Sequence, residues 1–173
     1  DVRAFDLFAP VYDLFMFPAD DLALRKGFAV ADRDVERILE IGGGTGRVAR
    51  TVGATVVDPS RSMLRRARSK GLETVQASAT ELPHPDGSVD AVVVVDAFHH
   101  FPDPERCLDE IARVLAPGGV LVVTEFDRST RLGRVLEAAE TAVGFDSTFY
   151  TAPELEAMIE ASGLTPRPIE YGF

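Results

Sequence analysis

Two sets of residues in this sequence could do chemistry, and each follows an apolar segment. Residues 39–50, LEIGGGTGRVAR, hold four glycines in five positions, with Glu40 before them and Asp58 at the end of the next apolar segment. Backbone without side chains lets a ligand approach closely, and a carboxylate can accept charge-assisted hydrogen bonds from both hydroxyls of a ribose. The second set is His99 and His100, and histidine is the side chain most easily poised as a base near neutral pH. The two sets predict a nucleoside-binding loop and a centre of proton transfer.

Alternating strand and helix patterns predict the frame that positions these residues. Strands are expected at 35–41, 54–58, 73–77, 89–96 and 120–125, with helices from about Thr45, over Ser60–Arg68 and over 103–116, and a turn at 117–119. Such alternation is typical of right-handed βαβ units. We therefore expect an α/β fold of the Rossmann-like, doubly wound class, with a mainly parallel sheet and helices on both faces. Ligands of such folds bind at the carboxyl ends of the strands.

The segments that flank this frame have different patterns. Residues 1–34 read mainly as helix, and 151–163 forms a second helix, in which Thr151 and Glu154 make a capping box. A short strand at 166–171 ends the chain, and its prolines suit a sheet edge. We expect one domain over 1–173, composed of an N-terminal helical lid (1–34), a cofactor-binding core (35–127) and a C-terminal acceptor-side segment (128–173).

The glycine spacing excludes two common nucleotide-binding loops. A phosphate-binding loop requires a lysine directly after its last glycine, and a dinucleotide loop requires G-x-G-x-x-G, whose third glycine would fall on Arg47 or Ala49. The remaining pattern, an acid followed by three alternate glycines, together with Asp58, suits a nucleoside without phosphates. Glu40 and the net charge of −10 suit a ligand with an ammonium or sulfonium group, as in S-adenosylmethionine. A tight turn without a ligand is the alternative.

With these residues in view, the sequence resembles the class I S-adenosylmethionine-dependent methyltransferases, in the branch of the ubiquinone and menaquinone C-methyltransferases (methyltransferase type 11-like domain). The resemblance covers about residues 5–125. It is carried by the segments FDLFAPVYD, ILEIGGGTGRVA, VVDPSRSMLRRAR, ASATELPHPDGSVDAVVVVDAFHHF and EIARVLAPGGVLVVTE. These motifs are specific for the fold and the cofactor, but they say little about the substrate.

The resemblance implies a set of residues that bind S-adenosylmethionine, whose product is S-adenosylhomocysteine. In this sequence they are Tyr12, Glu40, Gly42, Gly43, Gly44, Gly46, Asp58, Pro59, Met63, Ser78, Ala79, Thr80 and Asp96. Asp58 would bind the ribose and Glu40 would lie beneath the loop. Met63 would pack near the adenine or serve as helix core. The family usually has an aspartate at position 78, so Ser78 is a departure from its pattern.

The acceptor side is less well defined by the sequence. His99 and His100 are candidate catalytic bases, or they shape the turn after the fourth strand. The histidines and the single cysteine show no metal-ligand spacing beyond that adjacent pair, so no metal is expected. Aromatic residues cluster at 5–17 and 145–150. These aromatics either pack the flanking helices or form the pocket of a small, fairly apolar methyl acceptor.

The composition limits the remaining choices. The acidic net charge argues against nucleic acid as a partner, and the longest apolar segment is too short to span a membrane. The acidic start gives no sign of a signal peptide, and a single cysteine, Cys107, excludes an internal disulfide, so a cytoplasmic location is expected. A non-catalytic nucleoside-binding module and, less favoured, a nicotinamide-dependent oxidoreductase are the alternative functions. The oligomeric state stays open.

Overall fold

The centre of the fold is a parallel sheet of five strands. The computed structural model describes residues 21–142 and 144–168. Its strands are β1 (Ile38–Ile41), β2 (Thr55–Asp58), β3 (Thr74–Gln76), β4 (Val89–Val95) and β5 (Leu115–Thr124). Their order in the sheet is β3-β2-β1-β4-β5, and every neighbouring pair is parallel. The predicted doubly wound fold is confirmed, and the strand order reverses between β1 and β4, where such folds bind ligands.

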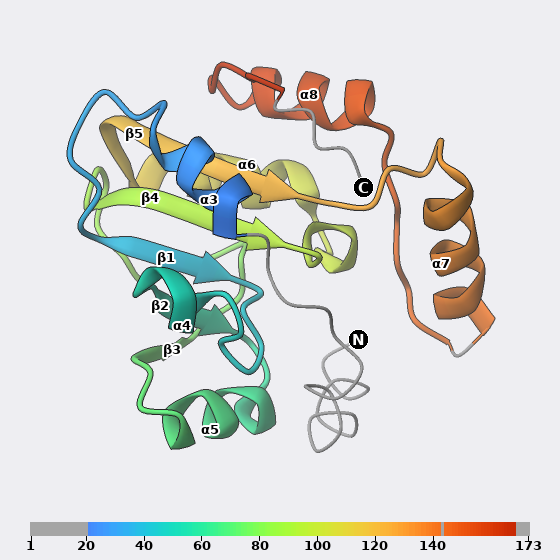
Figure 1. The fold of residues 1–173 in the computed structure, drawn as a ribbon, viewed down its shortest axis with the longest axis horizontal. Helices are drawn as coiled ribbons and strands as arrows, with labels where there is room; N and C mark the ends of the chain where they lie inside the picture. Colours follow the sequence, from blue (N-terminus) through green and yellow to red (C-terminus); the bar gives the residue numbers. More distant parts are fainter. Residues whose placement is uncertain (1–20, 143, 169–173) are drawn as a thin grey trace.

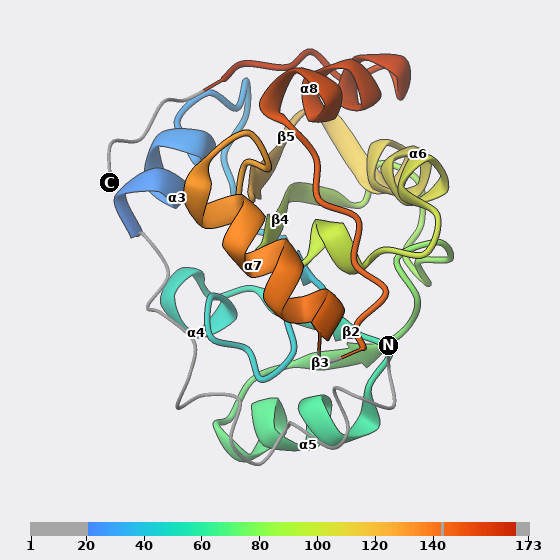
Figure 2. The ribbon, with the colours of Figure 1, turned by 90° about the vertical axis from the view of Figure 1, so that its right-hand side faces the viewer.

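Helices cover both faces of the sheet and one of its ends. One face carries α3 (Asp21–Phe28), α4 (Ala49–Val52) and α5 (Arg61–Ser69), while the other carries α6 (Pro104–Val114) and α8 (Ala152–Ala161). The remaining long helix, α7 (Arg131–Ala142), lies beyond the tips of the strand arrows, across the carboxyl end of the sheet (Figures 1 and 2). A short 3₁₀ turn, η1 (Phe98–His100), follows β4. The carboxyl edge is therefore enclosed by η1 and α7.

Alternation along the central strands explains both buried faces. In β1, Leu39 and Ile41 belong to the core beneath α6, whereas Ile38 belongs to the core beneath α4. Successive side chains of a strand point to opposite faces, so Glu40 lies on the α4 side. The valines of β4 divide between the two cores in the same way. This burial on both faces explains why the sequence of β4 has no polar face.

Side-chain caps define the start of three helices, among them the predicted capping box of Thr151 and Glu154. The side chain of Ser60 accepts a hydrogen bond from the Met63 amide at the start of α5, and Asp103 does the same for Arg106 in α6. In α8, Thr151 and Glu154 form the reciprocal capping box. Local side chains therefore define where these helices begin.

Two element boundaries were predicted wrongly, and glycines explain both. The first βα helix begins at Ala49 rather than at Thr45, because Gly44 and Gly46 have φ of +54° and +75°, which no α-helix accommodates. The segment 117–119 is not a turn but lies inside β5. There the pairing of β4 with β5 shifts register between Val89 and Ala91. The glycines therefore lie in an irregular part of the strand.

The chain ends also require corrections. Within the predicted lid, the described helix α3 packs on β5: Leu24 is fully buried, and a Cβ on Gly27 would meet Val122 at 2.6 Å. Residues 21–28 therefore belong to a layer of the core. Residues 1–20 lie outside the described part of the chain, so the lid over 1–34 stays a prediction. At the other end, 166–168 form no strand, and the rest of the predicted strand at 166–171 is not described.

Candidate functional site

The glycine-rich loop connects β1 to α4 at the carboxyl edge of the sheet. Gly42, Gly44 and Gly46 all have positive φ, a conformation that side-chain-bearing residues rarely adopt. The amide of Gly42 donates to the carbonyl of Val57 at 2.8 Å, which ties the start of the loop to β2. The loop therefore turns back over the ends of β1 and β2.

Three of the loop glycines are required by contacts inside the protein. A Cβ on Gly42 would lie 2.8 Å from the Cβ of Ala97, one on Gly43 would lie 2.8 Å from the Glu40 carboxyl carbon, and one on Gly46 would overlap Leu72. Their lack of side chains therefore has an explanation in the packing of the chain itself. The sequence favours a ligand as the reason for these glycines and leaves a tight turn as the alternative, and the internal contacts add packing as a further reason.

Glu40 lies beneath this loop as a buried acid. It is 3% exposed, and its Oε2 accepts a hydrogen bond of 2.7 Å from the Ala49 amide at the start of α4. Burial raises the pKa of Glu40 to about 7, against the opposing effect of the Ala49 hydrogen bond. Glu40 is thus a group near its titration midpoint at neutral pH, directly under the glycines.

Asp58, at the end of β2, fastens the loop from the other side. Its Oδ2 accepts from the Gly44 amide at 2.9 Å and its Oδ1 from the Ser60 amide at 2.8 Å. A carboxylate has about four acceptor positions, so backbone amides and ribose hydroxyls can share this one. Hydrogen bonds therefore tie Asp58 to the glycine loop and Glu40 to the start of the helix that follows it. The cofactor role that the sequence predicts for these residues stays a prediction.

Arg47 is a loop residue whose role the sequence reading missed. Its guanidinium donates to Asp96 at the end of β4, with Nη2 3.3 Å from Oδ2. Asp96 has φ of +50°, and its amide donates to the carbonyl of Thr124 in β5. Burial, followed by the nearby charge of Glu125, raises the pKa of Asp96. The pair connects the glycine loop to the carboxyl end of β4, and the sequence alone contains no signal for it.

The other predicted cofactor residues have more local surroundings. Pro59 is exposed, Met63 is fully buried in α5, and Ala79 belongs to the α6-side core. The hydroxyls of Ser78 and Thr80 hydrogen-bond to each other at 2.8 Å, just beyond β3. Tyr12 lies outside the described residues. The predicted binding roles of these residues stay predictions.

The two histidines lie in η1, which Glu125 holds in place. Glu125 directly follows β5, and its Oε1 accepts from the amides of Ala97 and Phe98. Its Oε2 lies 2.6 Å from His99 Nδ1. An acid at the end of the fifth strand, beside the strand that leads to the histidines, is a signal that the sequence did contain.

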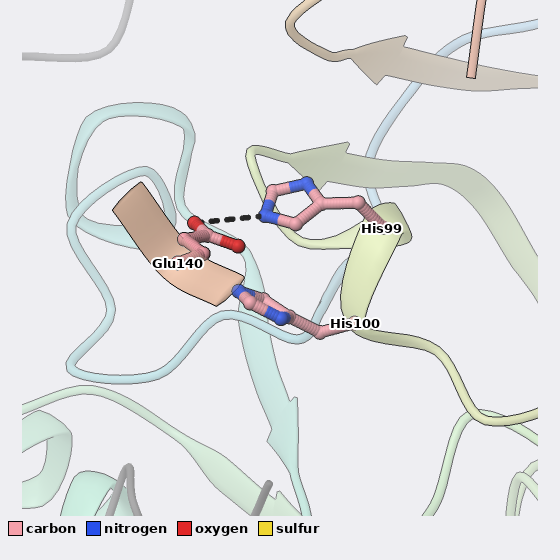
Figure 3. A group of neighbouring side chains, drawn as sticks. All are labelled: His99, His100 and Glu140. Carbon is pink, nitrogen blue, oxygen red and sulfur yellow. Dashed lines mark ion pairs between the residues drawn. The ribbon is translucent and has the colours of Figure 1, made fainter. Parts of the chain in front are cut away.

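Glu140 of α7 completes the surroundings of the histidines. Figure 3 shows both imidazoles directed toward its carboxylate, and His99 Nε2 lies 3.6 Å from Glu140 Oε1. The ligand atoms of His99, His100 and Glu140 all lie within 4.8 Å of one another. The expectation of no metal-ligand set considered histidine and cysteine spacing alone, and the fold adds a carboxylate from 40 residues further along the chain.

The pKa values of the two histidines are shifted in opposite directions. Burial lowers the pKa of His99, but its hydrogen bond to Glu125 and the nearby carboxylate of Glu140 outweigh burial and raise the pKa to about 9. Burial and the neighbouring charge of His99 lower the pKa of His100 to about 4. At neutral pH the pair therefore contains one imidazolium and one neutral imidazole.

Aromatic residues from the predicted acceptor side cover this turn. Phe149 stacks on His99 with ring centroids 4.4 Å apart, and Phe145 lies 5.5 Å from His100. Tyr150 packs edge-on against Phe98 at 5.8 Å. The predicted cluster at 145–150 therefore lies on the histidine turn. Phe149 is 1% exposed, so it serves packing in this structure.

The loop and the histidine turn are neighbours. Gly42 lies against Ala97 and Phe101, which flank the two histidines on either side. A buried acid, a turn made of backbone and a strand-end carboxylate fit a nucleoside without phosphates. The histidine turn next to them can hold a proton or an ion.

None of the helices in the described segments is both long and apolar enough to cross a bilayer.

Known proteins are similar to this chain in sequence. Residues 39–123 match the family model described as "Methyltransferase domain". A demethylmenaquinone methyltransferase of Thermus thermophilus is 40% identical over 140 residues, which are 70% of this chain and 64% of that protein. A phosphatidylethanolamine N-methyltransferase of Cereibacter sphaeroides is 34% identical over 178 residues, covering 90% of this chain and 87% of its own length.

A solved structure agrees with these sequence relatives. The crystal structure of an S-adenosylmethionine-dependent methyltransferase of Thermotoga maritima superposes with a TM-score of 0.78 at 31% identity, over 93% of this chain and 79% of the other. The chain belongs to the family of S-adenosylmethionine-dependent methyltransferases.

Proposed function

We propose that this chain transfers a methyl group from S-adenosylmethionine to a small, fairly apolar acceptor. The match covers 64% of the length of the Thermus relative, so the activity of the whole protein is part of this proposal. The observation that carries the proposal is the unit made of Glu40, the glycine loop and Asp58 at the carboxyl edge of the sheet. In this proposal 35–127 binds the cofactor and 128–173 faces the acceptor.

The residues of that unit divide the work of binding. Asp58 accepts the ribose hydroxyls, and the loop offers backbone to the methionine part of the cofactor. Glu40 supplies a negative charge below the loop, and a cationic ligand would favour its ionised form. The bound cofactor brings an already activated methyl group, so the protein has mainly to hold the two reactants in line.

The acceptor is proposed to be apolar on two grounds. Phe145 and Tyr150, which are both partly exposed, lie on the histidine turn, beside the glycine loop. The acceptors in the names of the two relatives, demethylmenaquinone and phosphatidylethanolamine, both carry long apolar chains. These grounds support a small molecule with an apolar portion. The cytoplasmic location stays a prediction.

Of the two histidines, His100 is the better candidate for a base. His99 is 4% exposed and lies between the carboxylates of Glu125 and Glu140, so we assign it a positioning role. His100 is partly exposed, and its Nδ1 hydrogen-bonds with Ser147 at 3.0 Å. It would act only where the acceptor must lose a proton.

The test is transfer of a labelled methyl group from S-adenosylmethionine to a panel of quinols, phenols and amines with short and long alkyl chains. We expect labelled product and an equal amount of S-adenosylhomocysteine, with higher kcat/KM for the longer chains. Cofactor binding without any transfer across the panel would favour the non-catalytic module. Transfer that is insensitive to chain length would contradict the apolar acceptor.

A further inference from the structure

The cluster of His99, His100 and Glu140 has features that an ion pair alone does not explain. Its members come from two separate elements, η1 and α7, and meet at the carboxyl edge of the sheet (Figure 3). The second oxygen of Glu140, Oε2, is buried and makes no hydrogen bond of acceptable geometry among the described residues, although the Ser147 hydroxyl, which bonds to His100, lies near this carboxylate. A buried carboxylate oxygen without a partner is costly, and an ion at this position would satisfy it.

His99 is oriented as metal-binding histidines are. Such histidines usually donate their second ring nitrogen to a carboxylate, which fixes the tautomer and the ring orientation. Here Nδ1 lies 2.6 Å from Glu125, and Glu125 is itself held by the Ala97 and Phe98 amides. The other nitrogen, Nε2, is thereby directed at Glu140.

The spacing of the ligand atoms suits a tetrahedral ion. The 3.6 Å between His99 Nε2 and Glu140 Oε1 is too long for a good hydrogen bond. Two ligands that are each about 2.0–2.1 Å from a tetrahedral zinc ion lie roughly 3.4 Å apart. All three ligand atoms lie within 4.8 Å of one another, so a side-chain shift of about one ångström would bring them to the spacing of ligands around one ion.

We propose that His99, His100 and Glu140 form a binding site for a divalent transition-metal ion of the zinc type, with Glu125 orienting His99. Two histidines and a glutamate with one open position are a donor set found in catalytic zinc sites. The open position would take a water molecule or an oxygen or sulfur donor of a ligand. Phe149 and Phe145 supply the apolar surroundings.

This site goes beyond the proposed methyl transfer and does not depend on it. An ion at this position lowers the pKa of a bound hydroxyl, thiol or water. A loaded site would therefore replace His100 as the means of removing a proton from the acceptor. Metal binding is measured without cofactor or acceptor, so its failure would leave the proposed methyl transfer standing.

The test is titration of the full chain, without an affinity tag and freed of metal by a chelator, with Zn²⁺ in competition with a chromophoric chelator. We expect one tight equivalent. Loss of an outer partner alone weakens metal binding roughly 10–100-fold, so we expect His100→Gln and Glu140→Gln to weaken it by at least about 100-fold. Matched controls are His84→Gln, outside the cluster, and Glu137→Gln, three residues earlier in α7, and both should bind Zn²⁺ like the parent chain.

A second readout needs no variant. Zn²⁺ should shift the imidazole ¹⁵N resonances of His99 and His100 in the parent chain and leave that of His84 unchanged. The site is contradicted if Zn²⁺ moves none of the three imidazoles, or if the folded variants bind it as tightly as the parent. In that case the three residues form an ion-pair cluster only.

Discussion

At the scale of single residues, the glycine loop has two reasons for its composition. Gly42, Gly43 and Gly46 would collide with the protein's own side chains if they carried a Cβ. Packing therefore explains these three glycines, and their presence does not test whether a ligand binds. Gly44 and Asp58, joined by a 2.9 Å hydrogen bond, are the pair on which the cofactor assignment can be tested. The first two predictions therefore concern these residues.

Asp58→Asn tests the ribose assignment. The amide keeps one oxygen for the backbone and removes the charge, so cofactor binding should weaken by about 1.5–3 kcal/mol, the range for a hydrogen bond to a charged group. In dissociation constants this is roughly 10–150-fold. Calorimetric titration with S-adenosylhomocysteine measures it, and the control is Glu73→Gln, an exposed acid directly before β3. Unchanged affinity in a folded variant would remove Asp58 from the site.

Gly44→Asn tests contact between the loop and the cofactor. Asparagine tolerates left-handed backbone better than most residues, so backbone strain in the variant should cost about 1 kcal/mol or less. The added side chain should weaken cofactor binding by at least about tenfold. Gly53→Asn is the matched control, because Gly53 has φ of +74° and open space around its Cβ. Equal affinities of the two variants would show that the loop does not touch the ligand.

At the scale of elements, the sequence did not indicate which partners two helices contact. α3 lies within the predicted lid, yet it packs on β5 with Leu24 fully buried. α7 lies beyond the strands and contributes Glu140 to the histidine turn. A sequence pattern shows that a helix exists, but its partner in space follows from the course of the whole chain. The next two predictions test individual elements.

Amide hydrogen exchange separates the lid from the core. Residues 21–28 should exchange slowly with and without S-adenosylhomocysteine, as should β5 at 115–124, because both belong to the packed core. The sequence predicts that residues 1–20 belong to the lid. Their amides should therefore exchange fast without S-adenosylhomocysteine and more slowly when it is bound. Equal exchange of 1–20 in both states would contradict the lid, and fast exchange of 21–28 would contradict the packing of α3.

Glu110 of α6 links that helix to the segment before β4, and this link should depend on pH. Its carboxylate accepts from the Leu82 amide at 2.9 Å and from Arg113 at 2.8 and 2.9 Å. The Arg113 hydrogen bond lowers the pKa of Glu110 to about 2. Because the pKa of the folded state lies below that of the unfolded state, the stabilisation is complete above about pH 4.5 and is lost as the pH falls toward 2.

Glu110→Gln should therefore lower the free energy of unfolding by about 2 kcal/mol at pH 7, with the deficit shrinking between pH 4.5 and 2. Urea unfolding at several pH values measures it. The exposed neighbour Asp109→Asn is the control and should change little. A deficit that stays constant down to pH 2 would mean that Glu110 acts through packing and not through its charge.

At the scale of the whole molecule, the sequence predicted the parallel sheet because its signals are local. The apolar run of β4 and the caps at Ser60, Asp103 and Thr151 need no knowledge of distant contacts. The segment 117–119 misled the prediction because Pro-Gly-Gly is typical of turns. In the fold Gly119 lies so close to the Asp90 carbonyl that a Cβ would be 2.8 Å from it, so β5 needs a glycine there.

The candidate site could be predicted only where it follows strand ends. Glu40 and Asp58 are adjacent in space because β1 and β2 are neighbours, which the fold class implies. The contacts of Arg47 with Asp96, and of His99 with Glu125 and Glu140, depend on loop conformation and on the placement of α7. No periodicity in the sequence encodes these.

We expect the carboxyl edge of this sheet to bind S-adenosylmethionine and not a dinucleotide. Calorimetric titration of the full chain with S-adenosylmethionine, and separately with NAD⁺ and NADH, tests it most directly. We predict saturable binding of one S-adenosylmethionine per chain and no heat of binding with either nicotinamide cofactor. A folded chain that gives no binding with S-adenosylmethionine, or one from which NADH displaces it, would contradict the account.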